Sequence, residues 1–201
     1  MSLKSSYRFI APIYDAFIER GISANIRRRS LAHLPQQGTA RVLISGAGTG
    51  LDFPFLPPCH DYTALDLTGA MLARAKRRMS GLQMQMVRGD SMALPFAMHS
   101  FDYVVLHLII AVVPQPQRCM AEAARVLKPG GRILLFDKFL RRGQRAWLRR
   151  CISPLVGRLA TRLDVVFEDV LEAAPELRVL SDQPALARGW FRLIELQKEE
   201  A

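Results

Sequence analysis

The sequence predicts an α/β fold in which a mostly parallel sheet has helices on both faces. Three observations predict it. Short apolar runs alternate with helix-like segments between residues 40 and 137, the first run leads directly into a glycine-rich turn, and the last two strand-like segments have no long helix between them. Alternating strands and helices are typical of βαβ units with right-handed crossovers. Two strands without a helix between them indicate an antiparallel hairpin at the sheet edge.

The individual elements follow from the hydrophobic periodicity. We expect core strands at residues 41–45, 62–66, 84–87, 103–107 and 132–136, helices at 69–79 and 117–127, and final strands at 177–181 and 190–196. The Lys-Pro-Gly-Gly sequence at 128–131 predicts a turn after the second of these helices, because proline and glycine interrupt a helix. Residues 5–34 predict two helices that are separated near Gly21.

Composition excludes several classes of protein. The chain has 201 residues, of which 50% are hydrophobic, so we expect one domain with a substantial core rather than a disordered chain. The longest apolar run, 103–113, is too short to span a bilayer. The N-terminus lacks the pattern of a secretory leader. Three scattered cysteines (Cys59, Cys119 and Cys151) have no metal-ligand spacing and indicate reduced thiols, so we expect a cytoplasmic protein without a metal site.

The net charge of +10 is concentrated in one segment. Residues 138–163 contain eight lysines and arginines and no acidic residue. Apolar residues recur there at helical spacing, which suggests that the segment lies on an anionic membrane surface as an amphipathic helix. The alternative is an ordinary helix that packs on the sheet and leaves its arginines solvated. We expect the smaller clusters, 27–29 and 74–78, to be solvated helix faces.

The strongest site signal is the turn that follows the first strand, Ser45-Gly46-Ala47-Gly48-Thr49-Gly50. Glycines at alternate positions allow positive φ angles and let a ligand approach the backbone. Asp66 ends the second strand twenty residues after Gly46, where a carboxylate can accept hydrogen bonds from ribose hydroxyls. The spacing is GxGxG rather than GxGxxG, which favours a nucleoside without phosphates. Taken singly, the glycines could form an ordinary turn, and Asp66 could cap the next helix.

Two later polar residues follow or end strands of the same predicted sheet. Asp90 follows the third strand and could accept a hydrogen bond from the exocyclic amine of a purine, or could be a surface carboxylate. His107 ends the fourth strand. It could be a catalytic base at the carboxyl edge of the sheet, or a hydrogen-bonded core histidine.

These motifs together resemble those of class I S-adenosylmethionine-dependent methyltransferases. The resemblance extends over residues 38–138 and rests on the glycine turn, on Asp66 to Leu72, on Gly89 to Phe96 and on Arg125 to Gly131. The N-terminal sequence 7–15 is similar to the opening of ubiquinone/menaquinone C-methyltransferases. The layout of 112–116 and 136–139 looks closest to short bacterial phosphatidylethanolamine N-methyltransferases. The resemblance implies a Rossmann-like seven-stranded sheet whose last strand is reversed, in agreement with the hairpin.

The resemblance also implies a set of S-adenosylmethionine-binding residues: Tyr14, Ser45, Gly46, Ala47, Gly48, Gly50, Asp66, Leu67, Asp90, Ser91, Met92 and His107. The glycines would approach the methionine part. Asp66 would bind the ribose and Leu67 would pack on the adenine. Asp90 would bind the adenine amino group, with a backbone N–H of Ser91 or Met92 directed at the ring.

The resemblance divides the single domain, 1–201, into four parts. These are an N-terminal helical lid (1–37) that carries Tyr7 and Tyr14, a cofactor-binding core (38–138), a basic helical insertion (139–175) and the C-terminal hairpin (176–201). One residue departs from the family pattern. Ile44 stands two positions before the first glycine, where the family usually has Asp or Glu. This departure motivates an alternative hypothesis, in which the chain is a binding protein that retains the cofactor pocket but has no transferase activity.

The predicted methyl acceptor is a lipid-like or hydrophobic small molecule. Phosphatidylethanolamine is the first candidate, through a peripheral contact with the inner membrane face, and a quinone precursor is the second. Asp137 and Lys138, after the fifth strand, could contact its head group or form a surface pair. Nucleic acid is disfavoured, because the segment after His107 is apolar and lacks the Asn/Asp-Pro-Pro-aromatic run of base-modifying enzymes. The sequence also lacks interleaved aromatic residues for base stacking.

Overall fold

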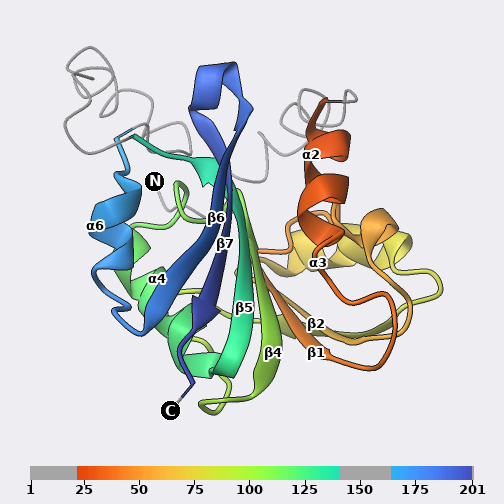
Figure 1. Cartoon of the computed structure of the whole chain (residues 1–201). Helices are drawn as coiled ribbons and strands as arrows, with labels where there is room; N and C mark the ends of the chain where they lie inside the picture. The colour runs from red at the N-terminus through yellow and green to blue at the C-terminus, as the bar shows by residue number, and fades with distance from the viewer. Residues whose placement is uncertain (1–21, 141–163, 201) are drawn as a thin grey trace.

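The computed structural model describes residues 22–140 and 164–200 and confirms the predicted α/β class (Figure 1). The elements in order are α2 (Ile22–Leu31), β1 (Arg41–Ser45), η1 (Phe53–Phe55), β2 (Asp61–Asp66), α3 (Gly69–Ala75), η2 (Lys76–Arg78), β3 (Gln83–Arg88), β4 (Phe101–His107), α4 (Pro116–Val126), β5 (Leu127–Lys138), α6 (Phe167–Leu171), β6 (Leu177–Leu186), η3 (Ala187–Gly189) and β7 (Phe191–Lys198).

Seven strands form one sheet in the order β3-β2-β1-β4-β5-β7-β6. Strands β1 to β5 run parallel to one another, whereas β7 lies antiparallel between β5 and β6. The chain builds β1, β2 and β3 outward in one direction and then returns to place β4 on the other side of β1. Ligands of open α/β sheets bind at the carboxyl ends of the strands beside such a reversal. The glycine turn follows β1 at this point.

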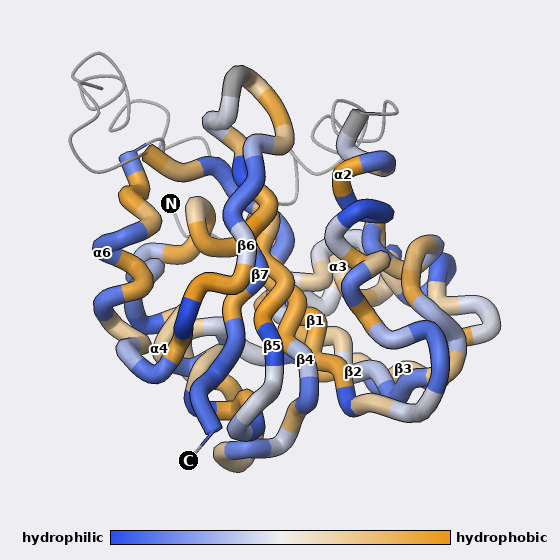
Figure 2. Tube along the Cα trace, in the orientation of Figure 1, coloured by the Kyte–Doolittle hydropathy of each residue, from blue (hydrophilic) through white to orange (hydrophobic). Residues whose placement is uncertain are grey.

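Helices cover both faces of the sheet, because alternate side chains of each strand point to opposite faces. Leu43 and Leu135 belong to the apolar cluster that α4 and α6 cover. Val42 and Leu134 belong to the cluster on the opposite face, which α2, η1 and α3 cover. Figure 2 shows hydrophobic residues concentrated along the central strands, with hydrophilic residues on the surrounding turns and helices.

The turn predicted at 128–131 is instead an irregularity within a strand. β5 already begins at Leu127, which pairs with Phe101, and the next regular pair joins Tyr103 to Arg132. Gly130 has a φ of 72°. Pairing with β4 on both sides of the Pro-Gly-Gly segment holds these residues in the ladder, and sequence periodicity does not report that tertiary contact.

The C-terminal hairpin is confirmed and is longer than predicted. β6 and β7 pair antiparallel, with register shifts between Val179 and Ser181 and between Pro184 and Leu186. β6 is an edge strand, so Pro184 can occupy it without depriving a neighbour on its outer side of a hydrogen bond.

The helix predicted after Gly21 is confirmed as α2. The preceding expected helix and most of the basic segment 138–163, with its expected helical structure, lie outside the described residues. In the described ranges 22–140 and 164–200, no helix is long and apolar enough to cross a membrane.

Candidate functional site

The segments that follow β1, β2 and β3 meet at the carboxyl edge of the sheet. The N–H groups of Gly46 and Ala47 both donate to the carbonyl oxygen of Leu65 at 2.9 Å, which fastens the glycine turn to β2. The N–H of Gly89, after β3, donates to the carbonyl oxygen of Asp66 at 3.0 Å. The structure therefore brings together three of the segments in which the sequence placed site residues.

The glycine turn combines close packing with an open backbone. Gly46, Gly48 and Gly50 have φ angles of 77°, 55° and 79°. A Cβ on Gly46 would lie 2.7 Å from the side chain of Ile109, so no larger residue fits there. A Cβ on Gly48 would meet nothing within 4 Å. Gly48 is therefore the position where a ligand can lie against the backbone of the turn.

Asp66 connects the turn to the loop after β2. Its Oδ2 accepts the N–H of Gly48 at 2.9 Å, and its Oδ1 accepts the N–H of Thr68 at 2.9 Å and the Thr68 hydroxyl at 3.1 Å. A carboxylate offers about four acceptor directions, so these three bonds leave room for a ligand hydroxyl. The carboxylate is thus held in a fixed position beside the open face of Gly48.

The loop after β3 folds over the end of β2 to reach β1. The Ser45 hydroxyl donates to the Ser91 hydroxyl oxygen at 2.8 Å, and both side chains are buried. Asp90 Oδ1 accepts the N–H of Met92 at 2.8 Å. Of the two backbone donors expected for the adenine ring, that of Met92 is therefore engaged by Asp90 itself.

Leu67 is 45% exposed and stands one residue after Asp66. An exposed leucine beside a polar site offers an apolar surface for a flat ring. Tyr14, the remaining member of the expected set apart from His107, lies outside the described residues.

His107 ends β4, but its side chain is only 1% exposed. Nδ1 lies 2.7 Å from Asp52 Oδ1, and Nε2 lies 2.9 Å from Ser30 Oγ. The ring also packs edge-on against Phe136. A general base needs a nitrogen that faces its substrate. Because both nitrogens are engaged within the protein, the geometry favours the hydrogen-bonded core histidine over the catalytic role.

Asp52 and Arg27 were not anticipated as site residues. Arg27 Nη1 donates to Asp52 Oδ1 at 2.7 Å, and both side chains are buried. Burial acts to raise the pKa of Asp52, but the charges and hydrogen bonds of Arg27 and His107 outweigh it and hold this pKa well below its usual range. The expectation that 27–29 is a solvated face is therefore wrong for Arg27, while Arg28 and Arg29 are exposed. Asp52 could have been singled out from the sequence because it is an isolated carboxylate in the otherwise apolar stretch 51–56.

Asp137 is 1% exposed, which excludes a surface pair with Lys138. Its carboxylate accepts the N–H of Ala111 at 3.1 Å and that of Lys138 at 2.8 Å. Burial raises the pKa of Asp137 to about 6, although these N–H groups oppose the shift. Leu108, directly after His107, has an unusual φ of 58°. Ala111 belongs to the same segment as Leu108. By accepting the N–H of Ala111, Asp137 therefore holds the strained loop after β4 in place.

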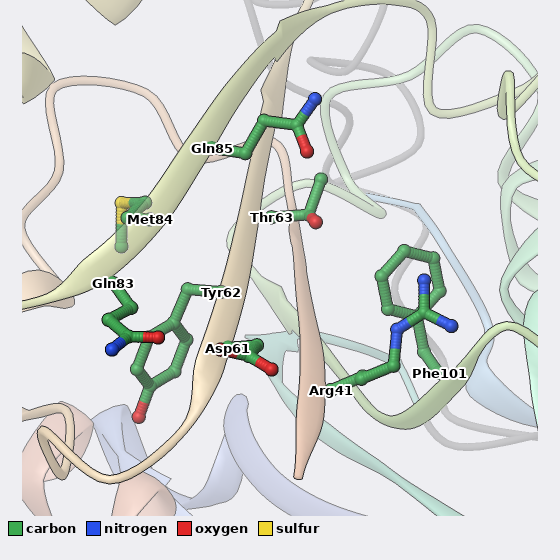
Figure 3. A pocket seen from close by; sticks show the side chains of 8 residues that line it. All are labelled: Arg41, Asp61, Tyr62, Thr63, Gln83, Met84, Gln85 and Phe101. Carbon is green, nitrogen blue, oxygen red and sulfur yellow. The ribbon is translucent and has the colours of Figure 1, made fainter. Parts of the chain in front are cut away.

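A cavity of about 340 Å³ lies at the opposite edge of the sheet (Figure 3). It is lined by Arg41, Asp61, Tyr62, Thr63, Gln83, Met84, Gln85 and Phe101. These residues belong to the amino-terminal halves of β1 to β4, so the cavity is remote from the glycine turn and is not part of the candidate site.

The residues at the carboxyl edge fit a nucleoside that carries a methionine side chain. The open backbone at Gly48 suits the methionine part, the Asp66 carboxylate suits ribose hydroxyls and the exposed Leu67 suits a purine ring. Ile44 is 1% exposed and packs in the core beneath α2. The methionine ammonium group therefore finds no carboxylate at position 44.

Comparison with known proteins agrees with this fit. A family described as "Methyltransferase domain" matches residues 43–135. The chain is 32% identical to a phosphatidylethanolamine N-methyltransferase of Cereibacter sphaeroides over 191 residues, 92% of this chain and 93% of that protein. It is 38% identical to a ubiquinone/menaquinone biosynthesis C-methyltransferase of Ruegeria sp. over 143 residues, 68% of this chain and 56% of that protein. The chain thus spans only about half of that second relative.

Solved structures share the fold at lower identity. A SAM-dependent methyltransferase from Thermotoga maritima has a TM-score of 0.69 at 18% identity, with 97% of this chain and 99% of that chain covered. An O-methyltransferase family 2 protein from Planctomyces limnophilus has a TM-score of 0.73 at 21% identity, with 98% and 62% covered. At these identities the likeness shows the fold alone.

Proposed function

This chain belongs to the class I S-adenosylmethionine-dependent methyltransferases, and we propose that it methylates the amine of phosphatidylethanolamine. S-Adenosylmethionine is its cofactor. When bound, the cofactor supplies a methyl group on a positively charged sulfur. The role of the chain is to hold that group in line with an uncharged amine, since alignment in one pocket can supply about 7–11 kcal/mol of the barrier reduction in favourable cases.

The observation that carries the proposal is the extent of similarity to the phosphatidylethanolamine N-methyltransferase, which covers 92% of this chain and 93% of that protein. Acceptor specificity resides in the parts of a methyltransferase that vary around the shared cofactor core. This similarity extends over 191 residues and therefore well beyond the expected cofactor-binding core, 38–138, so it supports a shared acceptor more strongly than similarity confined to the core would.

A contact with the membrane surface is part of the proposal. A phospholipid acceptor stays in the bilayer, so the enzyme must approach the interface to reach its head group. The basic segment 138–163 supplies positive charge without acidic residues. Each basic residue near an anionic bilayer contributes about 1 kcal/mol. Most of this segment lies outside the described residues, so this part rests on the sequence.

The proposal is tested by transfer of a labelled methyl group. The purified protein is incubated with S-[methyl-¹⁴C]adenosylmethionine and vesicles that contain phosphatidylethanolamine, with phosphatidylglycerol vesicles as the control. We expect label in N-methylated phosphatidylethanolamine and none with the control vesicles. Absence of label in that lipid, in a preparation that binds the cofactor in calorimetry, would contradict the proposal.

A quinone precursor is the second candidate, and the 38% identity to the Ruegeria C-methyltransferase favours it. The two candidates differ in the atom methylated, because the quinone ring accepts the methyl on carbon. Adding a prenylated demethylquinol to the same assay separates them. Label in the quinol product and not in the phospholipid would favour the second candidate.

A further inference from the structure

Three elements that enclose the carboxyl edge meet at one buried carboxylate. Asp52 follows the glycine turn by two residues, His107 ends β4, and Arg27 and Ser30 lie on α2, which is on the same side of the sheet as α3 (Figure 1). Asp52 Oδ1 accepts hydrogen bonds from Arg27 Nη1 and His107 Nδ1, both at 2.7 Å. Ser30 Oγ lies 2.9 Å from the other ring nitrogen, Nε2.

The protonation pattern of the cluster follows from its geometry. An ionised carboxylate can only accept hydrogen bonds, so the proton on His107 Nδ1 points to Asp52. In the neutral ring Nε2 then accepts the hydroxyl proton of Ser30. The positive charge of Arg27 balances the negative charge of Asp52, and together the bonds join α2, the turn and β4. Of these elements, α2 supplies none of the expected cofactor-binding residues.

The order hydroxyl, imidazole, carboxylate is also that of a serine hydrolase triad, but two features exclude that use here. Counted over the whole residue, Ser30, His107 and Asp52 are only 6%, 5% and 4% exposed. Arg27 shares the same carboxylate oxygen as His107, which lowers the ability of Asp52 to stabilise an imidazolium ion. The cluster therefore links α2, the glycine turn and β4, and it does not activate a nucleophile.

We propose that Asp52 is a positioning residue for the cofactor site, which holds the glycine turn against α2 and β4 in the conformation that binds S-adenosylmethionine. The turn has little freedom of its own: Gly50 donates its N–H to the Ala47 carbonyl oxygen at 3.0 Å, and Phe53 donates to that of Gly50 at 3.1 Å. A Cβ on Gly50 would lie 2.9 Å from the Phe53 ring. Displacement of Asp52 is therefore transmitted along these short turns to Gly48.

The first test uses Asp52→Asn, which keeps the size of the side chain and removes the anionic partner of Arg27. We expect the calorimetric Kd for S-adenosylmethionine to rise at least about tenfold, because charge-assisted hydrogen bonds are lost. The kcat at saturating cofactor should change less than the KM for the cofactor. A purely structural role would instead lower the folded fraction and leave the Kd of the folded protein unchanged.

Asp182→Asn is the matched control. Asp182 accepts a hydrogen bond at 2.9 Å from Arg192, a buried arginine on β7, so the substitution also breaks a carboxylate–arginine pair. It does so in the β6–β7 hairpin. We expect a lower melting temperature in both variants but a changed cofactor Kd only in Asp52→Asn. An equal Kd in Asp52→Asn and the native protein, measured on folded material, overturns the proposal.

Two replacements of His107 distinguish a positioning residue from a base. Asparagine places an amide N–H close to the position of Nδ1 and can still donate to Asp52, whereas glutamine places its amide near Nε2. We expect His107→Asn to keep the cofactor Kd within about threefold and His107→Gln to raise it about tenfold. The kcat/KM pH profile of His107→Asn should retain the native shape. Loss of a limb from that profile, with native cofactor affinity, would assign His107 as the base and overturn the positioning role.

Hydrogen exchange supplies a readout independent of activity. Because Asp52 couples the turn to α2, cofactor binding should slow amide exchange across Ile22–Leu31 in the native protein and much less in Asp52→Asn. Identical exchange of α2 with and without cofactor in the native protein would overturn the coupling. The cofactor Kd, the melting temperature and the hydrogen exchange are measured without a methyl acceptor. These tests of Asp52 therefore remain valid even if phosphatidylethanolamine is not the acceptor.

Discussion

The carboxylate of Asp66 accepts the backbone N–H of Gly48 at 2.9 Å, so the residue expected to bind ribose also fixes the glycine turn. The two residues come from different strand ends, eighteen positions apart. Their contact makes the turn and the carboxylate one rigid unit. A ligand that uses either one therefore depends on both.

Asp66→Asn should weaken cofactor binding by about ten- to a hundredfold, because an amide replaces a charged acceptor whose hydrogen bonds each contribute about 1.5–3 kcal/mol. Calorimetric titration with S-adenosylmethionine measures the change. Asp102→Asn is the control: this carboxylate binds Lys128 at 2.7 Å and the N–H of Arg41 at 2.8 Å at the opposite edge of the sheet. Comparable losses in the two variants would argue against a cofactor role for Asp66.

Gly48→Ala tests whether the open side of the turn is a ligand surface. Gly38 provides a matched control, since its φ is 78° and a Cβ there also meets nothing within 4 Å. A Cβ at positive φ costs about 1–2 kcal/mol at either position. We expect similar losses of stability in urea unfolding, but weaker cofactor binding only in Gly48→Ala. Equal cofactor affinity in the two variants would contradict the assignment of Gly48.

Stability should respond to pH through Asp137. Its pKa is about 6 in the folded protein and near the ordinary value of about 4 in the unfolded chain. Between these values the folded state binds more protons, so this residue makes the free energy of unfolding fall as pH rises from about 4 to about 6. The expected decrease is about 2–3 kcal/mol, at about 1.4 kcal/mol per pKa unit.

Asp137→Asn removes this titration. Urea unfolding at about pH 4.5 and about pH 7.5 should show the variant gaining stability relative to the native protein at the higher pH, by an amount on the order of the decrease calculated above. Asp61→Asn, at an exposed carboxylate, is the control. A stability difference between Asp137→Asn and the native protein that is constant across this range would show that Asp137 does not titrate there.

The membrane contact predicts an effect of charge reversal in the basic segment. The double variant Arg145→Glu with Arg149→Glu should sediment with anionic vesicles at least about tenfold less than the native protein, given about 1 kcal/mol for each basic residue near the surface. Arg74→Glu with Arg77→Glu makes the same change of net charge at two exposed arginines. Equal sedimentation of the two double variants would remove this segment from the proposed contact.

The strands and the glycine turn could be predicted from the sequence because their signals are local. Each expected strand overlaps an observed one, since a period of two residues or a continuous apolar run is visible without knowledge of its neighbours. The proximity of the turn, Asp66 and the loop at Asp90 also followed from order alone, because the carboxyl ends of parallel strands share one edge. The prediction of a turn at 128–131 was wrong, because pairing of β5 with β4 determines the conformation there.

The grouping of buried polar residues, in contrast, depends on contacts between distant parts of the chain. Asp52 contacts Arg27 and His107, which are 25 and 55 positions away, and nothing in the local pattern of any one of them names the other two. Arg27 resembles its exposed neighbours in sequence, and His107 has the position of an edge residue. Both side chains are buried in the structure. Each therefore needs a polar partner inside the protein, because a buried polar or charged group is tolerated only when it is paired. Local signals in the sequence thus predict the cofactor edge, whereas the packing of distant residues holds that edge in place.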